Sequence, residues 1–288
     1  MKLRIVLASI IASMLLGGAS VPASAQMADH PDTAELLGAA EVGYAPFMFP
    51  APDGTLQGFS FDMNTELAKR LGRPAFKVAD VPWANIFAGL YAKRYEYIAA
   101  PTTITEKRAD EMLFAEPYLD VQDAFVTPKD KPLKSMDELK GKKVAVVTGS
   151  VQDDWMTANA EKYGIEAMRF DSTPDAIQAV VVGRADSHMT ALLASLWLIK
   201  DMPNFAVDLV MPVGGQLGLP FRPEDTEFRD KVELQLECMK ADGTLADIYK
   251  KWFGIAPAAE SSTVNAVEGF GAKGWKGYSA VPHESVCS

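Results

Sequence analysis

The sequence is poor in metal-binding side chains and in positive charge. It has two cysteines and three histidines in 288 residues, and His30, His188 and His283 lie far apart. Neither cysteine has the spacing of a metal ligand, so the sequence predicts no metal site and no cofactor. It contains 28 basic and 38 acidic residues, a net charge of −10. Such an acidic surface disfavours nucleic acids and anionic membranes as partners.

Long apolar runs are also missing, apart from one near the N-terminus. Lys2 and Arg4 precede an apolar run that ends near Leu16, and Ala23-Ser24-Ala25 follows it. This order is typical of a cleavable signal peptide over residues 1–25, and the run is too short to span a bilayer. We therefore expect an exported and soluble protein. We also expect it to be a monomer.

The two cysteines then lie in an oxidising compartment. Cys238 falls within an expected helix, and Cys287 is the penultimate residue. We predict a disulfide between them, which would tie the tail to the body of the protein and stabilise it by about 4 kcal/mol. The alternative is two unpaired thiols.

Strands and helices alternate along the first part of the chain. An expected strand begins at Ala40 and runs into the loop 41–47, and apolar residues repeat at helical spacing over 62–71. A strand near 76–78 precedes a helix that Trp83 begins. This alternation predicts a largely parallel α/β sheet. Because ligands bind at the carboxyl ends of such strands, Tyr44, Trp83 and the stretch 101–108 should share one rim.

The stretch 101–108 has the features of a carboxylate site. Pro101 follows a short buried strand, Thr105 is placed to cap the next helix, and Arg108 falls in the first helical turn. A cation there opposes the helix dipole, so a bound anion is its natural compensator. Backbone N–H groups, threonine hydroxyls and the guanidinium would converge on one carboxylate. The simpler interpretation is a surface arginine.

A second junction of this kind lies further along the chain. The strand 143–147 leads through Gly149 to Ser150, which with Asp153 is similar to a capping box. The N–H groups of Val151 and Gln152 are then free for an anion. Two such helix starts facing each other across a cleft would couple ligand binding to closure of the cleft.

Several ordered motifs resemble one family. Thr103-x-Thr105-x-x-Arg108 resembles the carboxylate site of the periplasmic polar-amino-acid-binding proteins of ABC importers. Asp53-Gly54-x-Leu56-x-Gly58-Phe59, Phe114–Tyr118, Gly183–Asp186 and the closing stretch 242–254 are similar to the same family. The resemblance spans residues 37 to 254. It implies an α/β, two-lobed periplasmic-binding-protein fold (type II, Venus-flytrap) with two crossing hinge strands.

The resemblance also implies a division of the chain and a set of ligand contacts. Residues 26–126 with 212–254 would form the first lobe, residues 127–211 the second, and 255–288 a tail packed on the first. Arg108 would bind the carboxylate of an amino acid or a related molecule. Tyr44 and Trp83 would pack on the ligand, although each has the alternative of being an ordinary core aromatic. The remaining contacts would come from Pro101, Thr103, Ser150, Val151 and Thr190.

The chain departs from the family where a ligand ammonium would bind. Family members usually carry an aspartate five residues beyond Asp186, and this sequence has Ala191 there, after Thr190. A buried ammonium without a carboxylate is costly. We expect Glu41 to replace the aspartate, with a solvated loop acid as its alternative. Asp123 is a second candidate, in an expected crossing strand.

The resemblance implies a periplasmic, non-enzymatic protein that delivers its ligand to ABC permease subunits. Two alternatives remain. Cyclohexadienyl dehydratases share the fold and use a cleft carboxylic acid, a role open to Glu41, but no nucleophile–base pair or metal pattern is present. The chain could also serve a separate membrane sensor. The sequence does not define the ligand.

Overall fold

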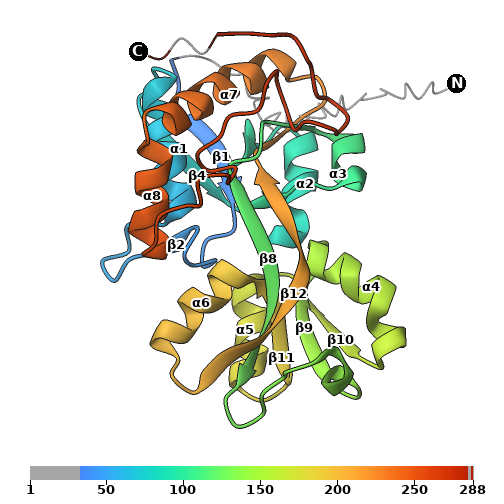
Figure 1. Ribbon diagram of the computed structural model, residues 1–288. Helices are drawn as coiled ribbons and strands as arrows, with labels where there is room; N and C mark the ends of the chain where they lie inside the picture. Colours follow the sequence, from blue (N-terminus) through green and yellow to red (C-terminus); the bar gives the residue numbers. More distant parts are fainter. Residues whose placement is uncertain (1–32, 285–286, 288) are drawn as a thin grey trace, which may run out of the picture.

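The computed structural model describes residues 33–284 and residue 287, so the expected signal peptide lies outside the described residues. Figure 1 shows two α/β lobes, one above the other, joined by two long strands. These strands are β8 (Leu119–Pro128) and β12 (Phe205–Gly218), which pair in antiparallel fashion. The two-lobed fold with two crossing strands is confirmed.

The first lobe is built on a parallel sheet with the strand order β4-β1-β5. Its strands are β1 (Leu36–Ala40), β4 (Phe76–Asp80) and β5 (Tyr97–Ile98). The helices around it are α1 (Phe59–Arg70), α2 (Trp83–Tyr91), α3 (Glu106–Glu111), α7 (Thr226–Ala241) and α8 (Thr244–Phe253). Two short pairs complete it: β2 (Phe49–Pro50) with β3 (Leu56–Gln57), and β7 (Leu113–Phe114) with β13 (Pro220–Phe221).

One boundary prediction in this lobe is wrong. The first strand ends at Ala40, where the sequence led us to expect its beginning. Leu36, Ala39 and Ala40 are fully buried, so burial of the earlier apolar residues determines where this strand runs. The loop that carries Glu41 and Tyr44 therefore leaves the carboxyl end of the strand directly, which places both residues at the rim.

The second lobe is built on a six-stranded sheet with the order β10-β9-β11-β8-β12-β6. Strands β9 (Lys143–Val147), β10 (Glu166–Phe170) and β11 (Ser187–Ala191) are parallel to one another, and β11 is antiparallel to β8. Strand β6 (Thr102–Thr103) comes from the first lobe and pairs with β12. One sheet therefore continues from the second lobe across the hinge.

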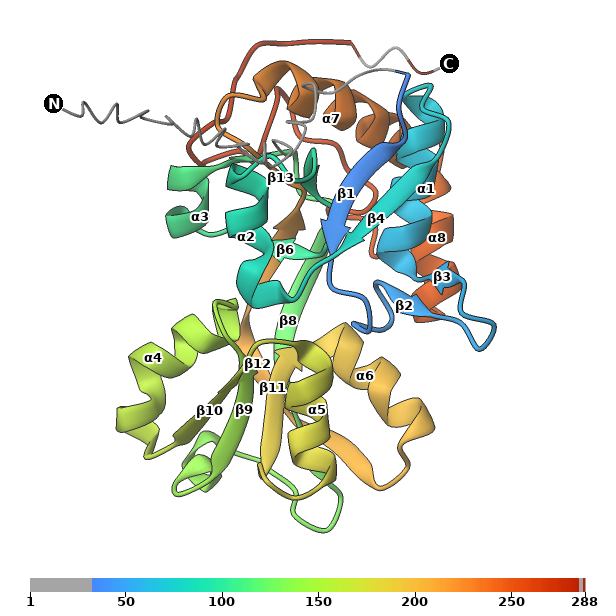
Figure 2. The same ribbon diagram turned by 180° about the vertical axis from the view of Figure 1, so that it is seen from behind.

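Three helices cover the second lobe: α4 (Val151–Tyr163), α5 (Thr173–Val181) and α6 (Leu192–Asp201). Figure 2 shows α4 and α5 beside β9 to β11, with their upper ends directed at the first lobe. The segment before β9 forms a short 3₁₀ helix, η1 (Met136–Leu139). Among the described residues no helix is both apolar and long enough to cross a membrane.

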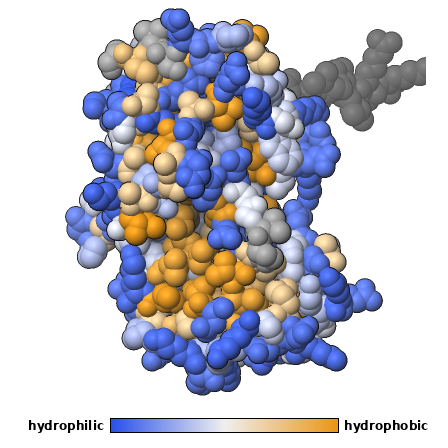
Figure 3. All heavy atoms as spheres, viewed as in Figure 1, coloured by the Kyte–Doolittle hydropathy of each residue, from blue (hydrophilic) through white to orange (hydrophobic). Residues whose placement is uncertain are grey.

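Apolar side chains also gather on one outer face of the second lobe. Figure 3 shows this patch on the lower lobe, in the view of Figure 1. Leu196 on α6 and Val210 on β12 are 43% and 39% exposed. The core of this lobe lies beneath, where Phe125, Val144 and Met189 are buried.

The C-terminal segment after α8 packs on α7 of the first lobe. A disulfide joins Cys238, in α7, to Cys287. Two backbone N–H groups of the segment, at Val267 and Gly271, donate to buried glutamates of the first lobe. Because the segment supplies these hydrogen bonds, it is part of the lobe's interior and not a free extension.

Candidate functional site

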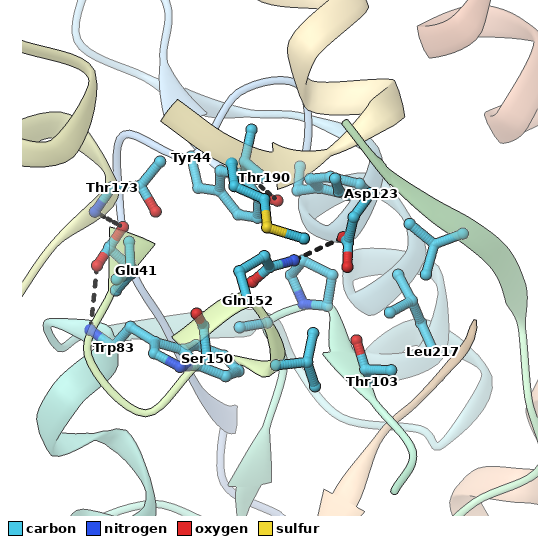
Figure 4. Close-up of a pocket in the computed structure, with 18 of the residues that line it drawn as sticks. Glu41, Tyr44, Trp83, Thr103, Asp123, Ser150, Gln152, Thr173, Thr190 and Leu217 are labelled. Atoms are coloured by element: carbon cyan, nitrogen blue, oxygen red, sulfur yellow. Dashed lines mark hydrogen bonds between the residues drawn. The ribbon is translucent and has the colours of Figure 1, made fainter. Parts of the chain in front are cut away.

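A pocket lies between the two lobes, at the carboxyl ends of β1, β9 and β11. Both lobes and the crossing strands contribute to its lining. Figure 4 shows several of these side chains directed into the common space. The nine residues that the sequence placed at the ligand all line it: Glu41, Tyr44, Trp83, Pro101, Thr103, Arg108, Ser150, Val151 and Thr190.

Arg108 links the two lobes at one end of the pocket. Its Nη1 donates to the Thr103 carbonyl oxygen at 2.8 Å, and its Nη2 donates to the Gly149 carbonyl oxygen of the second lobe at 3.1 Å. The guanidinium also lies over the rings of Trp83 and Phe87, at 5.5 and 5.3 Å from their centroids. Burial lowers the pKa of Arg108 to about 10, so it stays charged at neutral pH. Two bonds leave three of its five N–H donors for a ligand.

The turn before α4 faces Arg108 from the second lobe. Gly149 has a φ of +75°, in the left-handed region that favours glycine. Ser150 caps the helix, accepting the N–H of Asp153 at 3.1 Å. The next N–H groups, at Val151 and Gln152, have no acceptor inside the helix because they belong to its first turn. The turn therefore places the Gly149 carbonyl, which binds Arg108, and two free backbone N–H groups at the same end of the pocket.

Glu41 also connects the lobes, in a way that the sequence did not indicate. Its Oε2 accepts the N–H of Trp83 at 3.0 Å, and its Oε1 accepts the N–H of Thr173 at 2.8 Å. These two groups begin α2 of the first lobe and α5 of the second (Figure 4). Glu41 is 6% exposed, and its carboxylate is stabilised by the positive ends of both helices.

Two aromatic side chains form the wall near Glu41. The hydroxyl groups of Tyr44 and Thr190 lie 3.3 Å apart, another contact between the lobes. Burial raises the pKa of Tyr44 well above its ordinary value. Trp83 packs against a buried apolar cluster of the second lobe that includes Val147 and Ala176. Its indole N–H has no hydrogen-bond partner among the described residues. Both rings are therefore partly core and partly pocket wall.

The lobes also approach each other outside the pocket. Lys107 pairs with Asp154 at 3.2 Å across the interface. Gly43, with a φ of +110°, lies so close to Pro174 that an added Cβ would come within 2.9 Å of the proline ring. A side chain at position 43 would strain the backbone and hold the lobes apart. The described conformation is thus one with the lobes closed on the pocket.

Three pocket residues were missed or underweighted by the sequence analysis. Asp123, on β8, accepts a hydrogen bond from Gln152 Nε2 at 2.6 Å, and burial raises the pKa of its carboxyl group. His188, on β11, is buried, with its Nδ1 at 3.0 Å from the Ala145 carbonyl oxygen. The sequence analysis considered only the backbone N–H of Gln152, and it named His188 only as one of three scattered histidines. Residues far along the chain create the surroundings of both side chains.

Two α/β lobes enclose a pocket at the ends of their strands, with charged and hydroxyl groups set in a largely apolar wall. This arrangement defines a ligand-binding protein that closes around its ligand. The sequence profile of the bacterial extracellular solute-binding proteins, family 3, matches residues 37–255. The chain belongs to this family.

Known relatives agree with the assignment. The L-cystine-binding protein TcyJ of Escherichia coli (strain K12) is 30% identical over 257 residues, which are 87% of this chain and 96% of the relative. The L-cystine-binding protein TcyA of Bacillus subtilis (strain 168) is 35% identical over 217 residues, 73% of this chain and 78% of the relative. A solved ancestral arginine-binding protein bound to arginine has a TM-score of 0.74 and 31% identity, covering 78% of this chain and all of that one.

Proposed function

We propose that this protein captures an amino acid in the pocket between its lobes and delivers it to the permease of an ABC importer. The observation that carries the proposal is Arg108. Its guanidinium is buried, it contacts both lobes, and it lies at the rim that α4 faces with two backbone donors. A ligand carboxylate placed there would bind both lobes at once, and this would hold the cleft closed.

The class of ligand is suggested by the relatives, which are named for binding cystine and arginine. These amino acids share the α-carboxylate and differ in the side chain. In our proposal Thr103, Ser150 and Val151 complete the carboxylate site with Arg108. Tyr44, Trp83, Pro101 and Thr190 contact the rest of the ligand.

The proposal includes a periplasmic location, a monomeric state and the division of the chain into lobes and tail given above. It assigns no catalytic residue. The carboxylate of Glu41 already accepts two backbone N–H groups and is therefore poorly placed to donate a proton as a dehydratase acid would. Copurification with a permease rather than a membrane kinase would support delivery to an importer over signalling.

The first test is a thermal-shift screen of the proteinogenic L-amino acids and L-cystine. A compound that binds the native state raises the melting temperature. We expect one or a few of them to do so, and calorimetry then gives the dissociation constant. If no amino acid shifts the melting temperature, the proposed function is rejected.

The second test is the variant Arg108→Ala. It should weaken binding of the identified amino acid by about 2–5 kcal/mol, because one partner of a desolvated charge pair is removed. Arg108→Lys keeps the charge but not the planar fork, so its ligand affinity should lie between those of the wild type and Arg108→Ala. Arg94→Ala is the matched control, since Arg94 is exposed and does not line the pocket. Wild-type affinity in Arg108→Ala would overturn the carboxylate assignment.

A further inference from the structure

Two charged side chains that line the pocket, Arg108 and Asp123, have no hydrogen-bond partner of opposite charge among the described residues. Arg108 is a buried cation whose hydrogen bonds go to two neutral carbonyl groups. Glu41 is compensated by the first N–H groups of two helices. Asp123 remains, a carboxylate in the pocket wall whose side chain, among the described residues, accepts a hydrogen bond only from the neutral amide of Gln152. A bound molecule that carries one charge of each sign would complement Arg108 and Asp123 together.

We propose that Asp123 binds the ammonium group of the ligand, so that the pocket selects a zwitterionic amino acid over the corresponding simple acid. This inference rests on the proposed function and deepens it. It assigns to Asp123, instead of Glu41, the acidic role that the sequence analysis looked for.

The position of Asp123 in the sheet explains how it can take this role. In the register of β8 and β11, Asp123 lies directly opposite Ala191. Residues that face each other on antiparallel strands project to the same side of the sheet, with Cβ atoms about 4.5–5.5 Å apart. A carboxylate at position 123 or at position 191 can therefore reach the same region of the pocket. The methyl group of Ala191 leaves room there for the ligand.

The described neighbours of Asp123 provide no cation of the protein to pair with it, which leaves its carboxylate available for a cation of the ligand. Gln152 binds Oδ1, and within the described part of the chain Asp123 forms no ion pair. Gln152 lies on α4, whose first turn faces Arg108, so the same helix would orient Asp123 and contact the carboxylate end of the ligand. Burying an unpaired carboxylate is costly, and burial accordingly raises its pKa. An ammonium group would remove that cost on binding.

The experiment compares two ligands and four proteins by calorimetry. The ligands are the amino acid with the largest thermal shift and its analogue in which hydrogen replaces the α-ammonium group. The proteins are the wild type, Asp123→Asn, Asp123→Asn with Ala191→Asp, and Asp208→Asn. Asp208 is an exposed residue of β12 and provides the matched control for loss of one negative charge.

Asp123→Asn removes the charge but keeps an acceptor for Gln152. We expect it to weaken binding of the amino acid at least about 30-fold, and to leave binding of the des-amino analogue within a few-fold of wild type. The added aspartate at 191 should recover most of the lost affinity. Asp208→Asn should bind both ligands as the wild type does.

The possible failures are distinguishable. If Asp123→Asn binds the amino acid like the wild type, or loses both ligands equally while its melting temperature is unchanged, the role of Asp123 is rejected and the proposed function stands. If Asp123→Asn does not fold, the test is the comparison of the two ligands in the wild type. Equal affinity for the amino acid and its des-amino analogue then rejects the role of Asp123, and a preference for the amino acid supports it. If the wild type binds no amino acid, the proposed function fails, and this inference fails with it.

Discussion

Arg108 and Glu41 are both buried in the pocket wall, and their hydrogen-bond partners determine how far each can still bind a ligand. Arg108 has three N–H donors left for a ligand, because the two bonds described for its side chain use only two of the five. Both of those bonds go to neutral carbonyl groups, so among the described residues its charge also has no carboxylate bonded to it. Glu41 is similarly buried, but each of its two oxygens already accepts a backbone N–H group. Two charged side chains of one pocket thus differ in availability for a ligand, and residue type alone does not reveal the difference.

His188 gives a prediction at this scale. Burial lowers its pKa to about 4 from an ordinary value of 6.5. Between these values the unfolded chain binds a proton that the folded protein does not, so stability falls as the pH drops through this range, by up to about 3 kcal/mol. His188→Asn keeps a donor for the Ala145 carbonyl but cannot be protonated.

Urea denaturation at pH 7 and pH 4.5 measures this effect. The loss of stability between the two pH values should be smaller in His188→Asn than in the wild type, by about 2–3 kcal/mol. Equal losses in both proteins would show that His188 is protonated in the folded state or does not titrate in this range.

At the scale of elements, the C-terminal segment is joined to the first lobe by a hydrogen bond to a buried ion pair as well as by the disulfide. Lys240 and Glu116 form an ion pair at 2.7 Å with both side chains almost fully buried. The Val267 N–H satisfies the other oxygen of Glu116 at 2.6 Å. Removing the segment would leave buried charges with fewer partners, so it stabilises the first lobe although its described residues form no named helix or strand.

The disulfide gives the prediction for this scale. Cys238 and Cys287 are separated by 49 positions, and closing such a loop restricts the unfolded chain. Replacing both cysteines by serine should lower the free energy of unfolding by about 4 kcal/mol, as measured in urea. Ligand affinity should remain that of the wild type because neither cysteine lines the pocket. A loss below about 1 kcal/mol would mean that the hydrogen bonds to the buried glutamates hold the segment without the disulfide.

For the whole molecule, the main variable is the closure of the two lobes. Glu41, Arg108 and the Tyr44–Thr190 pair each connect the lobes within the pocket. Contacts that exist only in the closed state add to ligand affinity without touching the ligand. Glu41 is the clearest case, since its two oxygens hold helices of different lobes.

Glu41→Gln tests this coupling. One amide oxygen cannot accept both N–H groups, so closure should be less favourable and the dissociation constant of the ligand should rise about 10- to 100-fold. Small-angle scattering should show that the wild type contracts at a ligand concentration at which the variant does not. Glu35→Gln is the control, because Glu35 is exposed on the first lobe. If Glu41→Gln binds the ligand and scatters as the wild type does, Glu41 does not contribute to closure of the lobes.

The sequence by itself determined the alternation of strands and helices, the caps at Thr105 and Ser150, and which strand ends meet at the pocket. These features depend on neighbouring residues, whose spacing is visible along the chain. Only the tertiary structure decided the partners of Glu41, which lie 42 and 132 positions away, and the pairing of Asp123 with Ala191. It also decided where the tail packs. Such contacts depend on the register of strands and the approach of the lobes, because these bring together residues that no local pattern connects.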